Sequence, residues 1–219
     1  MSTFVIHTVP GSPFARAALA ALEEKGAAYR VAPVAPGTLR SPQHLARHPF
    51  GRVPVLEHDG FRLYETQAIL RYLDRVLTAP ALTPGDPRAA ARMDQALNIS
   101  DWYLFQGVAN VIGFHRIVRP RLMGLPPDEA AIAEALPKAH VVVGEVALLL
   151  GDNAYLAGDA LSLADLLVAS HMDFIAQTPE WSAVGASHKN LIAWLARISA
   201  RPSMQATTWE RVAAMAQAA

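Results

Sequence analysis

Three residues with side chains suited to chemistry stand at predicted helix starts: Ser12, Glu65 and Thr66. Ser12 follows a Pro-Gly break and precedes Pro13 and an Ala/Leu-rich run, a pattern typical of a helix N-cap. The exposed N–H groups and the positive end of the helix dipole favour a negative charge at such a position. Ser12 could therefore stabilise an anion, although local sequence alone favours the simpler interpretation that this serine only caps its own helix.

Residues 48–67 hold the strongest local signal in the chain. Asp59-Gly60 separates two apolar runs, which predicts a tight β-hairpin. Pro54 stands at the start of the first run, where a proline cannot donate to a strand ladder. Two interpretations are open on these residues alone. Pro54 is either a trans proline that starts the strand, or part of a cis Val53–Pro54 bond that turns the Val53 backbone outward to an extended ligand.

The first 78 residues alternate strand and helix signals. Runs of β-branched residues bounded by Pro and Gly predict strands, and a capped Ala/Leu-rich run predicts a helix between two of them. A helix between consecutive strands implies a parallel pair with a right-handed crossover. The expected order is βαβ followed by ββα, with strands at 3–9 and 29–34, a hairpin at 53–64, and helices at 12–26, from residue 42, and at 66–77.

A linker and an all-helical domain are predicted for the rest of the chain. Residues 79–87 contain three prolines and a glycine, so we expect them to link domains at 1–78 and 88–219. Ser162 and Asp165 form a close variant of the capping box, which is a folding signal and not a site. The expected helices cover 88–119, 127–150, 162–176, 189–200 and 203–216.

The composition is that of a compact globular protein, with 52% hydrophobic and 17% charged residues. Lys plus Arg equals Asp plus Glu, at 19 each, so no net field would attract nucleic acid or an anionic membrane. We expect neither a signal peptide nor a membrane span, because the apolar stretches are short and interrupted. The absence of cysteine excludes disulfides, zinc-thiolate sites and a cysteine nucleophile, and is compatible with the cytoplasm. Any thiol in the chemistry must arrive with a ligand.

His44 and His48 are four residues apart on a predicted short helix, a spacing that can place two imidazoles on one metal ion. No third ligand is evident in the sequence, cysteine is absent, and Pro49 follows at once. We therefore expect no metal site.

Three sets of segments stand in a characteristic order and spacing: Ser41–Pro54, Glu65–Ile69 with Tyr72-Leu73, and Tyr155–Asp159 running into Ser162–Leu166. Together with the motifs above, they resemble the cytosolic glutathione S-transferases over essentially the whole chain. The resemblance is closest to a serine-type, phi-like bacterial member. It implies a thioredoxin-like α/β N-terminal domain with a cis-Pro54, an all-α C-terminal domain and glutathione as co-substrate, without a metal.

The resemblance assigns roles in glutathione binding to individual residues. Ser12 would be the catalytic hydroxyl, and Val53, held by cis-Pro54, would pair with the cysteinyl backbone. Glu65 and Thr66 would hold the γ-glutamyl end. Arg40 and Arg52 would bind the glycine carboxylate. Phi-like members of the family usually have lysine and glutamine at these two positions, and a histidine is common at the position of Leu39. Either arginine can instead be a solvated surface charge.

The resemblance also implies an electrophile pocket between the domains and a homodimer. The pocket would be lined by Phe14 and one face of the first long helix, whose apolar residues at spacings of three and four are Trp102, Phe105, Ala109 and Ile112. Such a stripe more often forms core. Phe50 would insert into the helical domain of a partner subunit, with a buried core phenylalanine as the equal alternative.

The expected function is conjugation of glutathione to a hydrophobic electrophile, a cytoplasmic detoxification reaction. In this reaction Ser12 would activate the glutathione thiol as a thiolate, the nucleophile. Two alternatives would use the same thiolate, namely glutathione-dependent isomerisation and peroxide reduction. A third is a non-catalytic binding or scaffold protein that has kept the fold.

Overall fold

The computed structural model describes residues 3–35 and 37–217, which form two compact units. The first unit comprises Met1–Ala81 and Ala200–Ala219, and the second comprises Leu82–Ser199. None of the described helices is long and apolar enough to cross a membrane.

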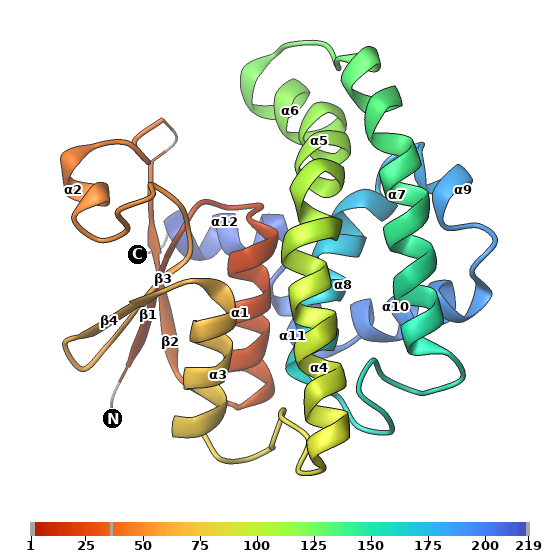
Figure 1. The fold of residues 1–219 in the computed structure, drawn as a ribbon. Helices are drawn as coiled ribbons and strands as arrows, with labels where there is room; N and C mark the ends of the chain where they lie inside the picture. Colours follow the sequence, from red (N-terminus) through yellow and green to blue (C-terminus); the bar gives the residue numbers. More distant parts are fainter. Residues whose placement is uncertain (1–2, 36, 218–219) are drawn as a thin grey trace. The chain divides into compact units, whose positions relative to one another are not determined.

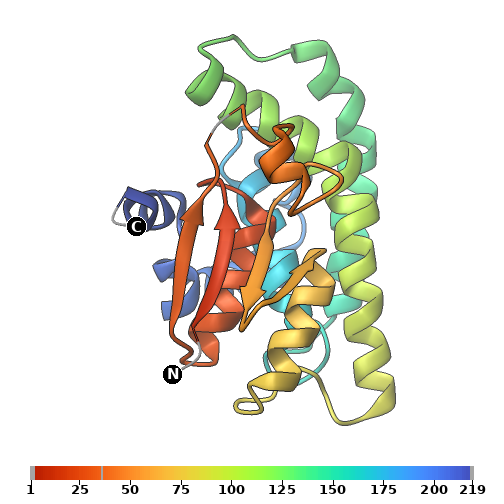
Figure 2. The same cartoon turned by 90° about the vertical axis from the view of Figure 1, so that its left-hand side faces the viewer.

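The first unit is built on a four-stranded sheet in the order β2-β1-β3-β4 (Figures 1 and 2). β1 (Phe4–Thr8) pairs parallel with β2 (Tyr29–Pro33) and antiparallel with β3 (Val55–His58), which pairs antiparallel with β4 (Phe61–Tyr64). The predicted βαβ–ββα order of a thioredoxin-like domain is confirmed. The helices of this unit are α1 (Pro13–Glu24), α2 (Pro42–Leu45), α3 (Thr66–Val76), α11 (Pro202–Ala206) and α12 (Trp209–Gln217).

The boundary signals of α1 and of the hairpin act as predicted. Ser12 caps α1 by accepting a hydrogen bond from the Ala15 N–H, and Pro13 opens the helix. Asp59 and Gly60 both have positive φ, at 49° and 80°, which matches the twist of the strands they join. α1 and α3 pack on one face of the sheet, where the fully buried side chains include Ile6, Leu19, Leu22, Leu56, Ile69 and Leu73.

The second unit is helical, as predicted. Its helices are α4 (Pro87–Ile99), η1 (Ser100–Ala109), α5 (Asn110–Gly113), η2 (Phe114–Val118), α6 (Arg119–Met123), α7 (Glu129–Leu150), α8 (Leu163–Ala176), α9 (Trp181–Val184) and α10 (Lys189–Ser199). η1 and η2 are π-helical segments.

The helix expected at 88–119 is not continuous. The backbone of Gln106 (ψ 116°) and Gly107 (φ 80°) is not helical. The helix resumes after this kink, where Asn110 Oδ1 accepts a hydrogen bond from the Gly107 N–H at 2.6 Å. Glycine is the residue that adopts a positive φ at no steric cost. A glycine within a helical pattern was therefore the only sequence signal for this kink.

The C-terminal residues also differ from expectation. The single helix expected at 203–216 is two, α11 and α12, because Thr207 is non-helical and Thr208 Oγ1 accepts from the Arg211 N–H as a new cap. These helices were expected in the helical domain. They group instead with the first unit, since α11 packs on α1 and α12 packs on β2.

The predicted capping box at the start of α8 is present and extends further than two residues. The Asp165 carboxylate accepts from the Ser162 N–H and hydroxyl, and also from the Leu156 N–H at 2.9 Å and the Trp194 indole N–H at 2.8 Å. It is fully buried. One carboxylate therefore joins a loop, the start of α8 and the side of α10.

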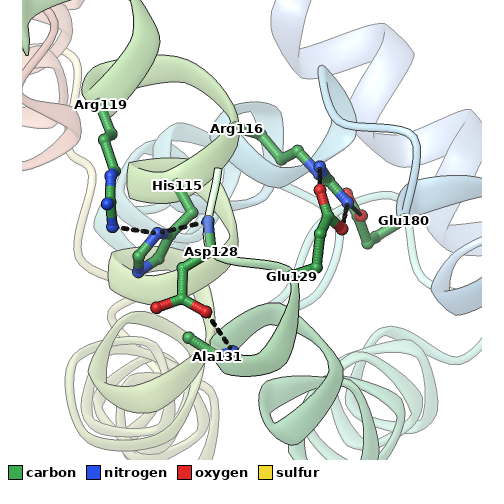
Figure 3. Close-up of polar contacts among 7 residues, drawn as sticks. All are labelled: His115, Arg116, Arg119, Asp128, Glu129, Ala131 and Glu180. Carbon is green, nitrogen blue, oxygen red and sulfur yellow. Dashed lines mark hydrogen bonds and ion pairs between the residues drawn. The ribbon is translucent and has the colours of Figure 1, made fainter. Parts of the chain in front are cut away.

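A second polar cluster joins three segments of the helical unit around Arg116 (Figure 3). Its guanidinium makes paired hydrogen bonds with Glu129 at 2.6 and 2.7 Å and with Glu180 Oε1 at 2.9 and 2.5 Å. Beside it, the His115 ring accepts from the Asp128 N–H at 3.2 Å. The start of α7 and the segment before α9 are thus tied to η2.

Replacing Arg116 with methionine should destabilise the protein in a pH-dependent way. Burial would raise the pKa of Glu180, but the hydrogen bonds from Arg116 outweigh it and hold that pKa below its usual value. The stabilisation of the fold by the Arg116–Glu180 pair is therefore complete above about pH 4.5, the pKa of an unperturbed glutamate, and is lost as the pH falls through the lowered pKa of Glu180. We expect Arg116→Met to lower the free energy of unfolding by about 2 kcal/mol at pH 7, and by clearly less near pH 3.5.

Urea denaturation at the two pH values measures this difference. Glu129→Gln is the matched control, because the Glu129 side chain is 69% exposed and its pairing should contribute little. An equal loss at both pH values would show that Arg116 acts by packing alone.

Candidate active site

The strand register brings the loops with the predicted site residues to one end of the sheet. Val55 lies opposite both His7 and Tyr64, and Thr8 lies opposite Pro33. β1, β2 and β4 therefore end, and β3 begins, at the same end. The loops that leave there hold Ser12, Arg40, Val53-Pro54 and Glu65-Thr66, and the segment around α2 lies above the ends of β1 and β2 in Figure 2.

Ser12 keeps a free hydroxyl hydrogen at the positive end of α1. Its Oγ accepts from the Ala15 N–H at 3.3 Å, and no described residue accepts the hydroxyl proton. A hydroxyl oxygen can accept while its O–H donates elsewhere. The geometry thus allows Ser12 to cap the helix and to donate to a bound anion at once, so the two interpretations of this serine are compatible.

The Val53–Pro54 peptide bond is cis, as the resemblance implied. Val53 is half-buried, while Pro54 and Val55 behind it are buried. Within the described residues, the Val53 N–H and C=O form no hydrogen bond, although β3 begins only two residues later. One donor and one acceptor of the main chain are therefore available to an extended ligand.

His44 holds the loop that leads into this bond. Its ring is buried, and Nε2 lies 2.8 Å from the Arg52 carbonyl oxygen. A carbonyl only accepts, so His44 must carry its proton on Nε2. The sequence showed His44 only as a candidate metal ligand. Its positioning role could not be found there, because the partner is a backbone atom eight residues away.

His48, on the other side of the same loop, packs against Tyr64 with ring centroids 4.8 Å apart. Burial lowers its pKa, against the opposing effect of the nearby Glu65 carboxylate. Among the described residues no group of three or more His, Asp or Glu side chains is arranged to hold a metal ion.

Glu65 and Thr66 stand where β4 turns into α3. Glu65 has a φ of 72°, which is uncommon for a residue other than glycine, and its carboxylate is exposed and makes no capping bond. Thr66, in the first turn of α3, is buried. Unfavourable backbone conformations of this kind gather at functional sites. The first N–H groups of α3 and an unpaired carboxylate thus lie side by side, and can bind the two opposite charges of an amino-acid end.

The Arg40 side chain packs against Gly51, and Arg52 is the next residue along the chain. Gly51 has a φ of 61°, and a Cβ there would lie 2.7 Å from the Leu39 carbonyl oxygen and 3.1 Å from Arg40 Cδ. Both arginines are exposed, and neither is paired with a carboxylate of the described chain. They supply two free cations next to the loop that contains Val53.

The predicted pocket residues differ in how much of each side chain is exposed within its own unit. Phe14 is half-buried two residues after Ser12. The kink at Gly107 divides the stripe on the helix: Trp102 is 68% exposed, whereas Ala109 and Ile112 are fully buried. Phe105 is half-buried and packs against the His171 ring, with centroids 5.0 Å apart.

A thioredoxin-like unit with a cis-proline loop, in a chain that also contains a helical unit, fits the class of glutathione-dependent enzymes that the sequence resembles. Two family models match, the glutathione S-transferase N-terminal domain over residues 2–75 and the C-terminal domain over residues 109–202. The chain belongs to the glutathione S-transferase family, and glutathione is its co-substrate.

Relatives of known name agree with this assignment. The chain is 35% identical to probable glutathione S-transferase GSTF2 of Oryza sativa subsp. japonica, over 85% of this chain and 87% of that protein. It is 34% identical to glutathione S-transferase 4 of Zea mays, over 88% and 86%. A structure of glutathione S-transferase-I bound with lactoylglutathione superposes with a TM-score of 0.82 at 31% identity, over 97% of this chain and 99% of that one.

Removing the His44 ring should weaken glutathione binding without affecting the chemistry. In His44→Ala the Arg52 carbonyl loses its hydrogen bond, so the loop with Val53 must be ordered by the ligand instead. One hydrogen bond is worth about 1 kcal/mol, which corresponds to about a fivefold rise in KM for glutathione at nearly constant kcat. Gln43→Ala, an exposed change on the same helix, is the control. An unchanged KM in His44→Ala would contradict the positioning role.

Proposed function

We propose that this transferase binds glutathione at the loop end of the sheet, where Ser12 donates its hydroxyl hydrogen to the thiol sulfur and holds it as the thiolate. The observation that carries the proposal is that Ser12 caps α1 with its oxygen and keeps its proton unused. A charge-assisted hydrogen bond and the helix dipole then act on the same sulfur.

The lowering of the thiol pKa that this proposal requires can be expressed as a free energy. A free thiol of this kind has a pKa of about 8.5, so only a few per cent is thiolate at neutral pH. Lowering that pKa by about two units needs roughly 2.7 kcal/mol of preferential stabilisation of the thiolate. One hydrogen bond to a charged group, with a share from the dipole, can supply most of it.

The other parts of glutathione would bind to the polar groups at this end of the sheet that have no partner within the described chain. Val53 would pair with the cysteinyl backbone through its N–H and C=O. The α3 N-terminus at Thr66 would take the γ-glutamyl carboxylate, and Glu65 its ammonium group. Arg40 and Arg52 would attract the glycine carboxylate. This proposed arrangement supports the assignment of the chain as a serine-type, phi-like member, which stays a prediction together with its bacterial origin.

The second substrate in this proposal is a hydrophobic electrophile, because the half-buried Phe14 places an apolar ring two residues from Ser12. Isomerisation and peroxide reduction would use the same thiolate. A scaffold role is disfavoured by the intact Ser12 hydroxyl and Glu65 carboxylate. A detoxifying enzyme of this kind would work in the cytoplasm, a compartment where glutathione keeps thiols reduced.

Replacing Ser12 with alanine tests the thiolate directly. We expect the apparent pKa of bound glutathione, followed by thiolate absorbance, to rise towards about 8.5, and conjugation near pH 6.5 to fall by about 10- to 100-fold. Ser41→Ala is a matched control, since Ser41 caps α2 with the same type of bond, to the His44 N–H at 3.2 Å. Wild-type activity and thiol pKa in Ser12→Ala would remove Ser12 from the mechanism.

We further propose that the protein is a homodimer joined through Phe50. Phe50 is 60% exposed, with only its edges near His48 and Tyr64. The helical unit offers an apolar groove of about 650 Å³ between η1 and α7, lined by residues that include Trp102, Tyr103 and Val141. All three are exposed. Insertion of Phe50 from a second copy into this groove would cover apolar surface on both partners. In this proposal Trp102 would lie at the dimer interface and not in the electrophile pocket.

Phe50→Ala should therefore shift the protein from dimer towards monomer at micromolar concentration, with Trp102→Ala having the same effect from the other side of the contact. Sedimentation velocity over a range of concentrations measures the change. Phe61→Ala is the control, because Phe61 is a comparably exposed phenylalanine (48%) on the β3–β4 hairpin. Unaltered dimerisation in both variants would disprove this interface.

A further inference from the structure

The C-terminal segment of the first unit runs back along α1 as a strap, defined here as residues 200–217. Arg201 and Ser203 bind Glu24 at the C-terminal end of α1. The Met204 carbonyl accepts at 3.2 Å from Arg16, which lies at the end of the first turn of the same helix. Trp209 then lies at Gly11, just before α1 begins. Successive strap residues thus contact α1 in reverse order, from Glu24 to Gly11.

The first attachment is an ion pair with good geometry. Arg201 Nε and Nη2 donate to the two oxygens of Glu24 at 2.7 and 2.8 Å, and the Ser203 hydroxyl donates to one of them. Burial would raise the pKa of Glu24, but these bonds lower it, so the carboxylate is ionised at neutral pH. The start of the strap is therefore firmly held.

The last attachment is a close packing contact. A Cβ on Gly11 would lie 2.2, 2.4 and 2.5 Å from Cε3, Cζ3 and Cδ2 of Trp209. No side chain fits in that space, so the six-membered ring of the indole lies directly on the Gly11 main chain. Gly11 also has a φ of 85°, which favours glycine for a second reason. The next residue in the chain is Ser12.

Few hydrogen bonds hold the turn beneath this ring, and the Thr8 hydroxyl donates one of them to the Val9 carbonyl at 3.0 Å. The turn is closed by the Ser12 N–H bond to the Val9 carbonyl at 3.3 Å, and Ser12 Oγ makes its capping bond at 3.3 Å. Both are longer than the usual 2.7–3.2 Å range of N–H···O bonds. Pro10 has no N–H to contribute, and no other main-chain bond within the described chain closes the turn. Packing by Trp209 is thus a main constraint on where Ser12 points.

Beyond Trp209, α12 is held on β2. The Tyr29 hydroxyl donates to Glu23 at 2.5 Å and lies 3.9 Å from Met215 Sδ. Figure 2 shows α12, in dark blue, beside β2. The indole is therefore presented from a helix that is docked at both its ends.

We propose that Trp209 is a positioning residue for the thiolate: its ring fixes the Pro10–Gly11–Ser12 turn and so directs the Ser12 hydroxyl at the sulfur of glutathione. The proposal rests on the function proposed above for Ser12. The indole needs no contact with glutathione. Its effect passes through the main chain of Gly11 to the direction of one O–H bond.

The test is the pH profile of Trp209→Ala. The apparent pKa of bound glutathione should rise by about one unit towards that of the free thiol, so the conjugation rate well below that pKa falls about tenfold and the rate above pH 8.5 stays near wild type. KM for glutathione should change less than kcat at low pH. Trp209→Phe, which keeps an aromatic ring over Gly11, should recover most of the loss.

Met215→Ala is the matched control, because it trims the same helix at its contact with Tyr29 and leaves Gly11 covered. A wild-type pH profile in Trp209→Ala overturns the proposal, and so does an equal shift in Met215→Ala, which would show that docking of α12 is sufficient. If wild-type protein does not lower the thiol pKa at all, the proposed function itself fails. If only Ser12→Ala raises the pKa, that function stands and the role of Trp209 is rejected.

A second pair of variants covers the case in which Trp209→Ala does not fold. In Gly11→Ala the new Cβ collides with the indole, so the turn should move and the thiol pKa should rise. Trp209→Leu added to Gly11→Ala relieves the collision and should bring the pKa partly back. If the two substitutions change the thiol pKa additively, the two residues are not coupled, and the proposal is overturned.

Discussion

The pairing of β1 with β3, and of β3 with β4, is the constraint on which the candidate site depends. Because Val55 is opposite both His7 and Tyr64, the turn before β3 and the start of α3 are placed at the end of the sheet where β1 reaches Ser12. A slip of one residue would turn Leu56 and Ile6 out of the core and move every loop. The apolar side chains that form the core thus also set the relative positions of a hydroxyl, a free peptide group and a helix N-terminus.

At this end of the sheet, structural and chemical roles fall on the same atoms. Ser12 satisfies a helix N–H with its oxygen and still has a proton to donate. His44 satisfies the Arg52 carbonyl, and the next residue, Val53, has an unpaired main chain. Glu65 has an unfavourable backbone conformation, and its carboxylate is left unpaired. Each unsatisfied group is held by neighbours that are satisfied, which is how a polar site is kept in place before its ligand binds.

Polar anchors join distant segments of the helical unit in addition to its apolar packing. Asp165 accepts four hydrogen bonds from three segments, and Arg116 joins two carboxylates that lie far apart in sequence. Asp165 is fully buried and has several partners, which is the condition under which a buried carboxylate is tolerated, whereas Arg116 is half-buried. These anchors hold segments around helices that are interrupted at Gly107 and at the π-helical stretches.

The sequence by itself determined the features that depend on neighbours along the chain. Caps at Ser12 and Ser162, the Asp59-Gly60 turn and the strand–helix order follow from local hydrogen bonding and backbone preference, and all are present. The resemblance added the cis Val53–Pro54 bond. Only the tertiary structure decided what His44, Trp102 and Trp209 contact, and that the last two helices pack on α1 and β2. Those contacts join residues up to about 200 positions apart, and the periodicity of a helix shows that it has an apolar face but not which surface that face will cover.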